Sequence, residues 1–234
     1  MEKDPGMQSH TGRNDPPGTL RSRGKSRILE PNRLKMKFSL SRLNALTMIL
    51  LFSLTSNAGA QENQLPYSEI PDPPETYSAG GVVSRLIDGL GFRFYWATEG
   101  LREKDLAFRP GEEARSTMET VDHIYGLSRV ILNTALNKPN TPQAQVQMTF
   151  DEKRAEVLKM LKQASEIFRQ ADDLSQYSVV FVRDGNRNEF PFWNQINGPI
   201  SDALCHCGQI VSHRRASGNP FNSNVSVFTG KVRQ

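Results

Sequence analysis

The feature that most constrains the fold is a set of four long segments with apolar residues at helical spacing. In each segment these residues recur every three or four positions, which places them on one stripe of an α-helix. The segments span residues 78–101, 117–137, 150–171 and 199–217. The sequence therefore predicts an all-α fold: a four-helix bundle with a long crossover before the last helix.

Two of the segments begin with a capping box, in which a Ser or Thr is followed three residues later by Glu. Ser116 and Glu119 open the second segment, and Thr149 and Glu152 open the third. In this motif the hydroxyl accepts a backbone N–H of the first turn, and the Glu side chain accepts the N–H of the capping residue. We therefore expect helices to begin near residues 117 and 150.

The connection before the fourth segment contains a β-like run. Residues 177–182 are rich in β-branched and aromatic side chains, and Asp184 with Gly185 is a turn signal. We expect an extended crossover or a short hairpin here rather than a sheet.

Residues 36–60 have the three parts of a secretory signal peptide. Lys37 and Arg42 give a positive start, residues 43–54 are apolar, and small residues precede a cleavage point after Ala60. The apolar run is too short to span a bilayer as a helix. We expect a secreted or periplasmic protein with no stable membrane anchor after cleavage; the alternative is a buried apolar helix.

Residues 1–35 are polar, basic and rich in Gly and Pro. One interpretation is a start codon placed too far upstream, with Met36 as the true start; the other is a long basic leader or a nucleic-acid arm. Residues 1–60 hold ten Lys/Arg and four Asp/Glu, so the net charge of +4 for the whole chain becomes −2 for the remainder. We therefore expect no nucleic-acid binding by the folded domain.

The remaining chain is organised as one domain with two flanking segments. Residues 61–75 are Pro-rich and polar and are expected to be extended rather than packed, residues 76–220 form the helical domain, and residues 221–234 form a C-terminal tail. A domain of this size can bury a real core. An exposed face on such a bundle would suit a homodimer.

Three polar residues point to a divalent-metal site. Asp202 and His206 are four residues apart, so on a helix they lie on the same face. His123, in the second amphipathic segment, is the source of a third ligand. Two histidines and a carboxylate, with the remaining positions open to water, form a catalytic type of metal site. Such a site lowers the pKa of its bound water towards neutrality.

Each of these residues also has a structural interpretation. Asp202 lies in the first turn of its helix, where the helix dipole alone favours an acid. His123 and His206, each taken alone, could be satisfied core histidines. His213 shares the stripe of Asp202 and His206 but precedes two arginines near the helix end. We interpret His213 as a structural or supporting group rather than a ligand.

The chain has two cysteines, Cys205 and Cys207, on either side of His206. Residues two apart on a helix point in nearly opposite directions, so the pair cannot form a disulfide without breaking the helix. We expect them to be small apolar core residues; a redox or ligand role is the alternative.

The last helical segment resembles a known family. Residues 206–210 (HCGQI), followed by 214–215 (RR) and 218–220 (GNP), resemble the last helix of the DinB/YfiT-like family of metal-dependent enzymes. Residues 122–124 (DHI), after a capped helix start, resemble the second helix of that family. The resemblance covers residues 78–220.

The resemblance implies a four-helix bundle and a divalent ion, most often zinc or nickel, with iron or manganese also compatible. It implies that His123 and His206 are ligands. The family's other histidine falls at position 202, where this chain has Asp202. A carboxylate can still bind the ion, and it reduces the net charge of the site. Some members are thiol-dependent transferases, a poor match for a secreted protein. We therefore expect a hydrolase that uses metal-bound water on a small-molecule substrate. The alternatives are a noncatalytic helical-bundle binding protein of the same fold and a thiol-dependent transferase.

Four further residues are candidates for a pocket or for support of the ligands. Trp193 and Phe192, just before the fourth helix, could wall a pocket or pack in the core. Gln209 and Arg214 lie on the last helix, and Arg214 could hold an anionic substrate group or be a solvated cation at the helix end.

Overall fold

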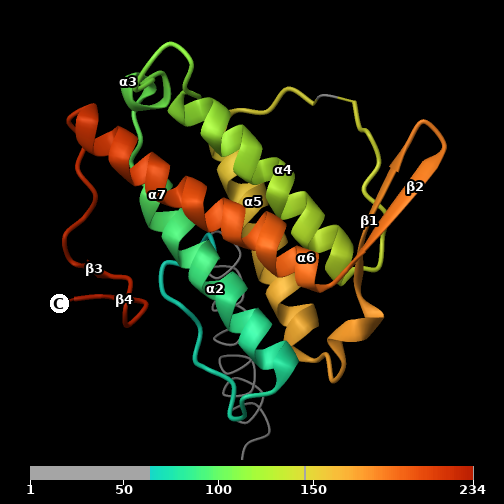
Figure 1. Ribbon diagram of the computed structural model, residues 1–234. Helices are drawn as coiled ribbons and strands as arrows, with labels where there is room; N and C mark the ends of the chain where they lie inside the picture. The colour runs from blue at the N-terminus through green and yellow to red at the C-terminus, as the bar shows by residue number, and fades with distance from the viewer. Residues whose placement is uncertain (1–63, 145, 234) are drawn as a thin grey trace, which may run out of the picture. The chain divides into compact units, whose positions relative to one another are not determined.

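The computed structural model describes residues 64–144 and 146–233, so the predicted leader (1–35) and signal peptide (36–60) lie outside the described residues. Four long helices run through the described chain (Figure 1). They are α2 (Ala79–Thr98), α4 (Thr117–Ala135), α5 (Phe150–Arg169) and α7 (Ser201–Ala216). Both α5 and α7 pack against α2 and against α4, so the core lies among all four helices.

Shorter helices fill the connections between the long ones. They are α3 (Glu103–Leu106), η1 (Leu174–Gln176), α6 (Trp193–Gln195) and the π-helical turn η2 (Ile196–Ile200). The largest fully buried apolar side chains come from all four long helices and from η2: Phe92, Phe94, Phe168, Ile87, Leu90, Ile124, Ile131, Leu158, Leu161, Ile200 and Ile210. Their burial excludes water from the centre of the domain and stabilises the helix packing.

Both predicted capping boxes form. The Ser116 hydroxyl accepts from the Glu119 N–H at 3.1 Å, and the Glu119 carboxylate accepts from the Ser116 N–H at 2.7 Å. Thr149 and Glu152 make the same pair of bonds at 3.3 and 2.8 Å. The helices α4 and α5 therefore begin at the predicted residues, 117 and 150.

The prediction of an all-α four-helix bundle was wrong, because the described chain also contains two antiparallel hairpins. These pair β1 (Ser178–Arg183) with β2 (Asn186–Pro191), and β3 (Val225–Ser226) with β4 (Lys231–Val232). The first hairpin turns at Asp184 and Gly185, whose φ angles of 49° and 78° are those of a tight hairpin turn. The β-branched residues of β1 prefer this extended backbone.

The first hairpin is attached to the helices by the segment that follows α4. The Asn140 N–H donates to the Val180 carbonyl at 2.7 Å, and the Val182 N–H donates to the Asn140 carbonyl at 2.9 Å. The Asn140 side chain accepts from Asn133 of α4 at 2.9 Å. One residue therefore joins β1 to α4, a long-range contact that no local sequence pattern encodes.

The Pro-rich segment before α2, for which the sequence predicted an extended chain without packing, turns at residues 66–67 and carries one packed anchor. Tyr67 is buried against Gly91 of α2, where a Cβ would come within 2.4 Å of the tyrosine ring. Its hydroxyl donates to the buried carboxylate of Asp88 at 3.0 Å. Asp88 also accepts from Ser165 at 2.6 Å and from Arg169 at 2.8 Å. The segment therefore completes a buried polar network between α2 and α5.

The C-terminal residues, predicted to be a tail, fold back as the second hairpin. The Ile70 N–H donates to the Gly230 carbonyl at 2.9 Å, which joins this hairpin to the segment before α2. Among the residues that the structure describes, no helix combines the length and the apolar character needed to cross a membrane.

Candidate metal centre

Three of the predicted site residues meet between α4 and α7, which pack side by side (Figure 1). His123 comes from the second turn of α4, and Asp202 and His206 come from the first two turns of α7. The carboxylate lies between the imidazoles: Asp202 Oδ2 is 3.0 Å from His123 Nε2, and Asp202 Oδ1 is 3.2 Å from His206 Nε2. One donor atom from each residue lies within 4.8 Å of the others, so this group could hold a metal ion.

The spacing of these atoms suits a divalent ion. With ligand bonds of about 2.1 Å, two ligand atoms lie about 3.0 Å apart at a right angle and about 3.4 Å apart at the tetrahedral angle. The separations of 3.0 and 3.2 Å fall in this range, and each ends on a different oxygen of Asp202. The two imidazole rings meet edge to face, with centroids 4.7 Å apart and planes at 89°, so they reach the carboxylate from different directions.

Gln209 orients the ring of His206 and selects its tautomer. Gln209 Oε1 lies 2.7 Å from His206 Nδ1, and a carbonyl oxygen can only accept, so Nδ1 carries the proton. In the neutral ring this leaves a lone pair on Nε2, which faces a carboxylate oxygen of Asp202 that is also electron-rich. A cation between these two atoms relieves their repulsion. Gln209 is therefore the kind of outer contact that orients a metal-binding histidine, and its spacing of three residues from His206 is the sequence signal for this contact.

The group is closed on one side and open on the other. The His206 side chain is 9% exposed, whereas those of His123 and Asp202 are 33% and 43% exposed. An ion held here would be anchored from the helix interface. Its remaining coordination positions would face the solvent, as in catalytic rather than structural metal sites.

The π-helical turn η2 sets the register of the ligand helix. It joins α6 to α7 without a break and contains Pro199, which lacks an N–H. The Ser201 hydroxyl donates to the Ile196 carbonyl at 2.6 Å and so satisfies an acceptor in this irregular turn. Pro199 and Ile200 stay buried while Asp202 turns towards α4. Single π-turns of this kind are frequent at functional sites.

His213 lies outside the metal group, seven residues after His206 and about 10 Å further along α7. Its Nδ1 is 3.2 Å from the Thr117 hydroxyl, and its ring packs against Phe108 at a centroid distance of 5.7 Å. Burial lowers the pKa of His213 below its usual value. The residue therefore ties the end of α7 to the start of α4.

Arg214 is engaged with the backbone. Its guanidinium donates to the carbonyls of Trp96 and Ala97 at 2.9 and 3.0 Å and to the carbonyl of Asn219 at 2.9 Å. The first two acceptors belong to the last turn of α2, whose carbonyls have no partner within the helix. The structure thus places Arg214 as a cap on α2, with its donors turned away from the solvent.

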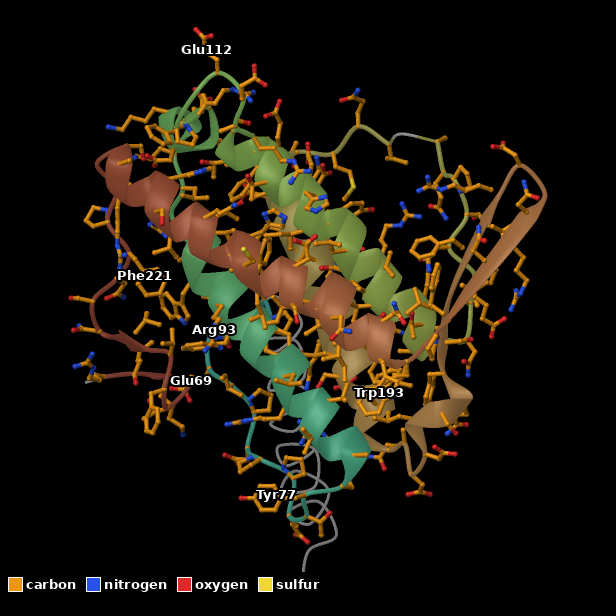
Figure 2. All side chains as sticks on the ribbon, viewed as in Figure 1. Glu69, Tyr77, Arg93, Glu112, Trp193 and Phe221 are labelled. Atoms are coloured by element: carbon orange, nitrogen blue, oxygen red, sulfur yellow. The ribbon has the colours of Figure 1, made fainter. Side chains whose placement is uncertain are left out.

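Trp193 lines a cavity at a distance from the metal group. It is the first residue of α6, and Figure 2 shows it at the beginning of the helical segment that leads into α7. The cavity measures about 690 Å³ and is also lined by Tyr177, Phe192 and Glu189. Trp193 is 74% exposed, whereas Phe192 is buried in the core. It lies more than two helical turns before Asp202, so the two residues belong to separate sites.

Both cysteines are free, and the prediction that both are core residues is wrong for Cys205, whose place on α7 turns it to the solvent. Cys205 is exposed, and Cys207 is buried in the core. Burial raises the pKa of the Cys207 thiol to about 12, so this thiol stays protonated at neutral pH and is a poor nucleophile or ligand.

Comparison with known proteins found no matching family model, no matching curated protein and no matching solved structure. The resemblance to the DinB/YfiT-like family therefore stays a prediction from the sequence. The geometry of the metal group is independent of it.

Proposed function

We propose that this protein is a divalent-metal-dependent enzyme, a hydrolase acting on a small molecule. The observation that carries the proposal is the convergence of His123, Asp202 and His206 from two helices, with one side of the group open to solvent. A divalent ion in the group would polarise a water molecule and lower its pKa, which supplies a nucleophile at neutral pH.

Zinc and nickel are the ions that we propose first. Imidazole nitrogens suit both ions, and two histidines with one carboxylate are a frequent ligand set of catalytic zinc. Iron and manganese are the alternatives, because the same ligand set also serves non-haem iron and because manganese accepts carboxylate oxygens.

The three ligand residues would have different roles in binding the ion and orienting a substrate. His206, nearly buried and held by Gln209, gives one fixed ligand position. Asp202 offers its two oxygens to two different neighbours and compensates part of the charge of the ion. Because Asp202 and His123 form the exposed edge of the group, a substrate would approach from their side.

The proposal extends to the location of the enzyme. The pattern in residues 36–60 supports a secreted or periplasmic protein, and the likeness of residues 206–210 to the DinB/YfiT-like helix supports metal-dependent chemistry. The protonated state of the buried Cys207 thiol gives no support to a thiol-based role for that residue.

The second candidate is a noncatalytic helical binding protein. One observation favours it: a proton on His123 Nε2 would satisfy Asp202 by a 3.0 Å hydrogen bond and close the group without an ion. The two candidates differ in metal content, which can be measured directly.

The test is metal analysis by mass spectrometry of the full chain, which is purified without a chelator and without a nickel affinity column. We expect about one zinc, nickel, iron or manganese ion per chain, lost in His206→Ala and in His123→Ala. The matched control is His213→Gln, which alters a histidine of the same helix outside the group and should keep the ion. An absence of metal in the unmodified chain, even after reconstitution, would overturn the proposal in favour of the binding protein.

A further inference from the structure

A second cavity begins about one helical turn beyond His123 on α4. It measures about 370 Å³, within the range of small-molecule sites. Its walls come from α4, from residues 140–142 and from β1. In Figure 1 the segment after α4 and the β1–β2 hairpin lie on the same side of α4. The backbone bonds between Asn140 and β1 hold two of these walls together.

The cavity carries two arginines, Arg129 from α4 and Arg183 from the end of β1. Within residues 64–144 and 146–233, neither forms an ion pair, and neither side chain donates a hydrogen bond. Most other arginines of this region are engaged, as Arg154 and Arg169 show. Two guanidinium groups with free donors in one hollow are a match for a carboxylate or a phosphate, whose oxygens they can bind in pairs.

Gly126 connects this cavity to the metal group. It lines the cavity and follows His123 by three residues, so it lies about 4.5 Å further along the same face of α4. A Cβ at Gly126 would meet nothing within 4 Å, so the surface between the histidine and the cavity is open. By contrast, Gly80 and Gly91 of α2 are required by close packing, at 2.2 and 2.4 Å.

A glycine inside a helix lowers helix stability relative to alanine. No close packing requires a glycine at Gly126, and the position leaves space free on the helix surface. This space lies where a molecule bound at the metal group would extend into the cavity.

We propose that the cavity of Arg129 and Arg183 is a subsite for an anionic group of the substrate. This inference rests on the proposed function and names its substrate class: a small molecule with a carboxylate or a phosphate on one side of the group that reacts at the metal centre. The arginines bind and orient the anion, and the open surface at Gly126 lets the rest of the molecule reach His123 and Asp202.

The test is calorimetric titration of the full chain, with and without metal, using inorganic phosphate and acetate as separate probes. We expect binding in the metal-free chain, weakened by about tenfold or more in the double variant Arg129→Gln and Arg183→Gln, because two charge-assisted contacts are lost. The control is Arg187→Gln, which removes the same charge from the same hairpin outside the cavity and should change affinity less than twofold. Tighter binding of phosphate or of acetate identifies which anion the subsite prefers.

A further variant tests the contribution of the cavity's shape separately from that of its charge. Gly126→Leu fills the open surface without changing charge and should weaken the binding of the preferred anion. Gly208→Leu, at a helical glycine with equally open surroundings outside this cavity, should not.

Two results would overturn the inference: equal affinity in the double arginine variant, or anion binding that needs the metal and ignores the arginines. Metal analysis of the same samples keeps this failure distinct from that of the proposed function. A chain without metal whose anion binding still depends on the arginines would retain the subsite and lose the metalloenzyme proposal.

Discussion

Gln209→Met tests the metal group without altering a ligand. Gln209 Oε1 accepts from His206 Nδ1 at 2.7 Å, and methionine has a similar length but no comparable acceptor. In the variant, His206 loses the contact that fixes its ring and its protonated nitrogen. Loss of such an outer contact weakens metal binding by about 10- to 100-fold, which corresponds to about 1.4–2.7 kcal/mol.

The effect can be read as a thermal shift. At an ion concentration of about 100 times the wild-type Kd, binding stabilises the folded chain by about 2.7 kcal/mol, and a 10- to 100-fold weaker site retains about 1.4 to 0.4 kcal/mol. A domain of this size gains about 2–4 °C in Tm per kcal/mol. The rise in Tm caused by metal should therefore fall from about 5–11 °C to about 1–6 °C.

The matched variant is Gln209→Glu, which keeps an acceptor at the same position and should retain the affinity of the parent. Competition with a chromophoric chelator gives Kd for all three proteins, and scans without metal correct for the intrinsic effect of each substitution. An unchanged Kd in Gln209→Met, or an equal loss in both variants, would refute the role assigned to this hydrogen bond.

Three further predictions concern stability. Gly126→Ala should raise the free energy of unfolding by about 0.5–1 kcal/mol. Gly91→Ala should lower it by about 1–3 kcal/mol, because the new Cβ would meet the Tyr67 ring. Urea titration measures both changes, and a change of the same sign in both variants would contradict the argument. Gln195 is fully buried, and both polar atoms of its side chain lack a partner in the described chain. Gln195→Met should therefore leave the Tm unchanged or raise it, and a clear loss would reveal a partner for the amide. Burial lowers the pKa of His213, so the unfolded chain takes up a proton that the folded chain resists, and stability falls as the pH drops below about 6.5. His213→Gln should flatten this part of the stability–pH profile, and an unchanged profile would place the titration elsewhere.

Local chemistry made part of this protein predictable. The starts of α4 and α5 follow from Ser116 and Thr149, because a capping box is complete within four residues. The pairing of Asp202 and His206 follows from one helical turn, and the addition of His123 needed only two helices packed along their polar edges. These features depend on spacing along the chain.

The rest depended on contacts between distant segments. The β-like run of residues 177–182 was compatible with either an extended crossover or a hairpin. The hairpin is held in part by backbone hydrogen bonds to Asn140, some forty residues earlier in the chain. Arg214 was a candidate for anion binding, but its donors cap α2, more than a hundred residues away in sequence. Arg129 and Arg183 carry no motif and become neighbours only when the hairpin docks on α4.

The anchoring of Tyr67 has a consequence for the choice of an expression fragment. A fragment cut at residue 76, the predicted start of the helical domain, would lack this side chain, so the space over Gly91 would fill with water and Asp88 would lose a hydrogen-bond donor. The Ile70 contact to the second hairpin would be lost with it. The shortest autonomous unit therefore begins ahead of Tyr67, and limited proteolysis of the purified chain should leave a resistant core that still contains this tyrosine.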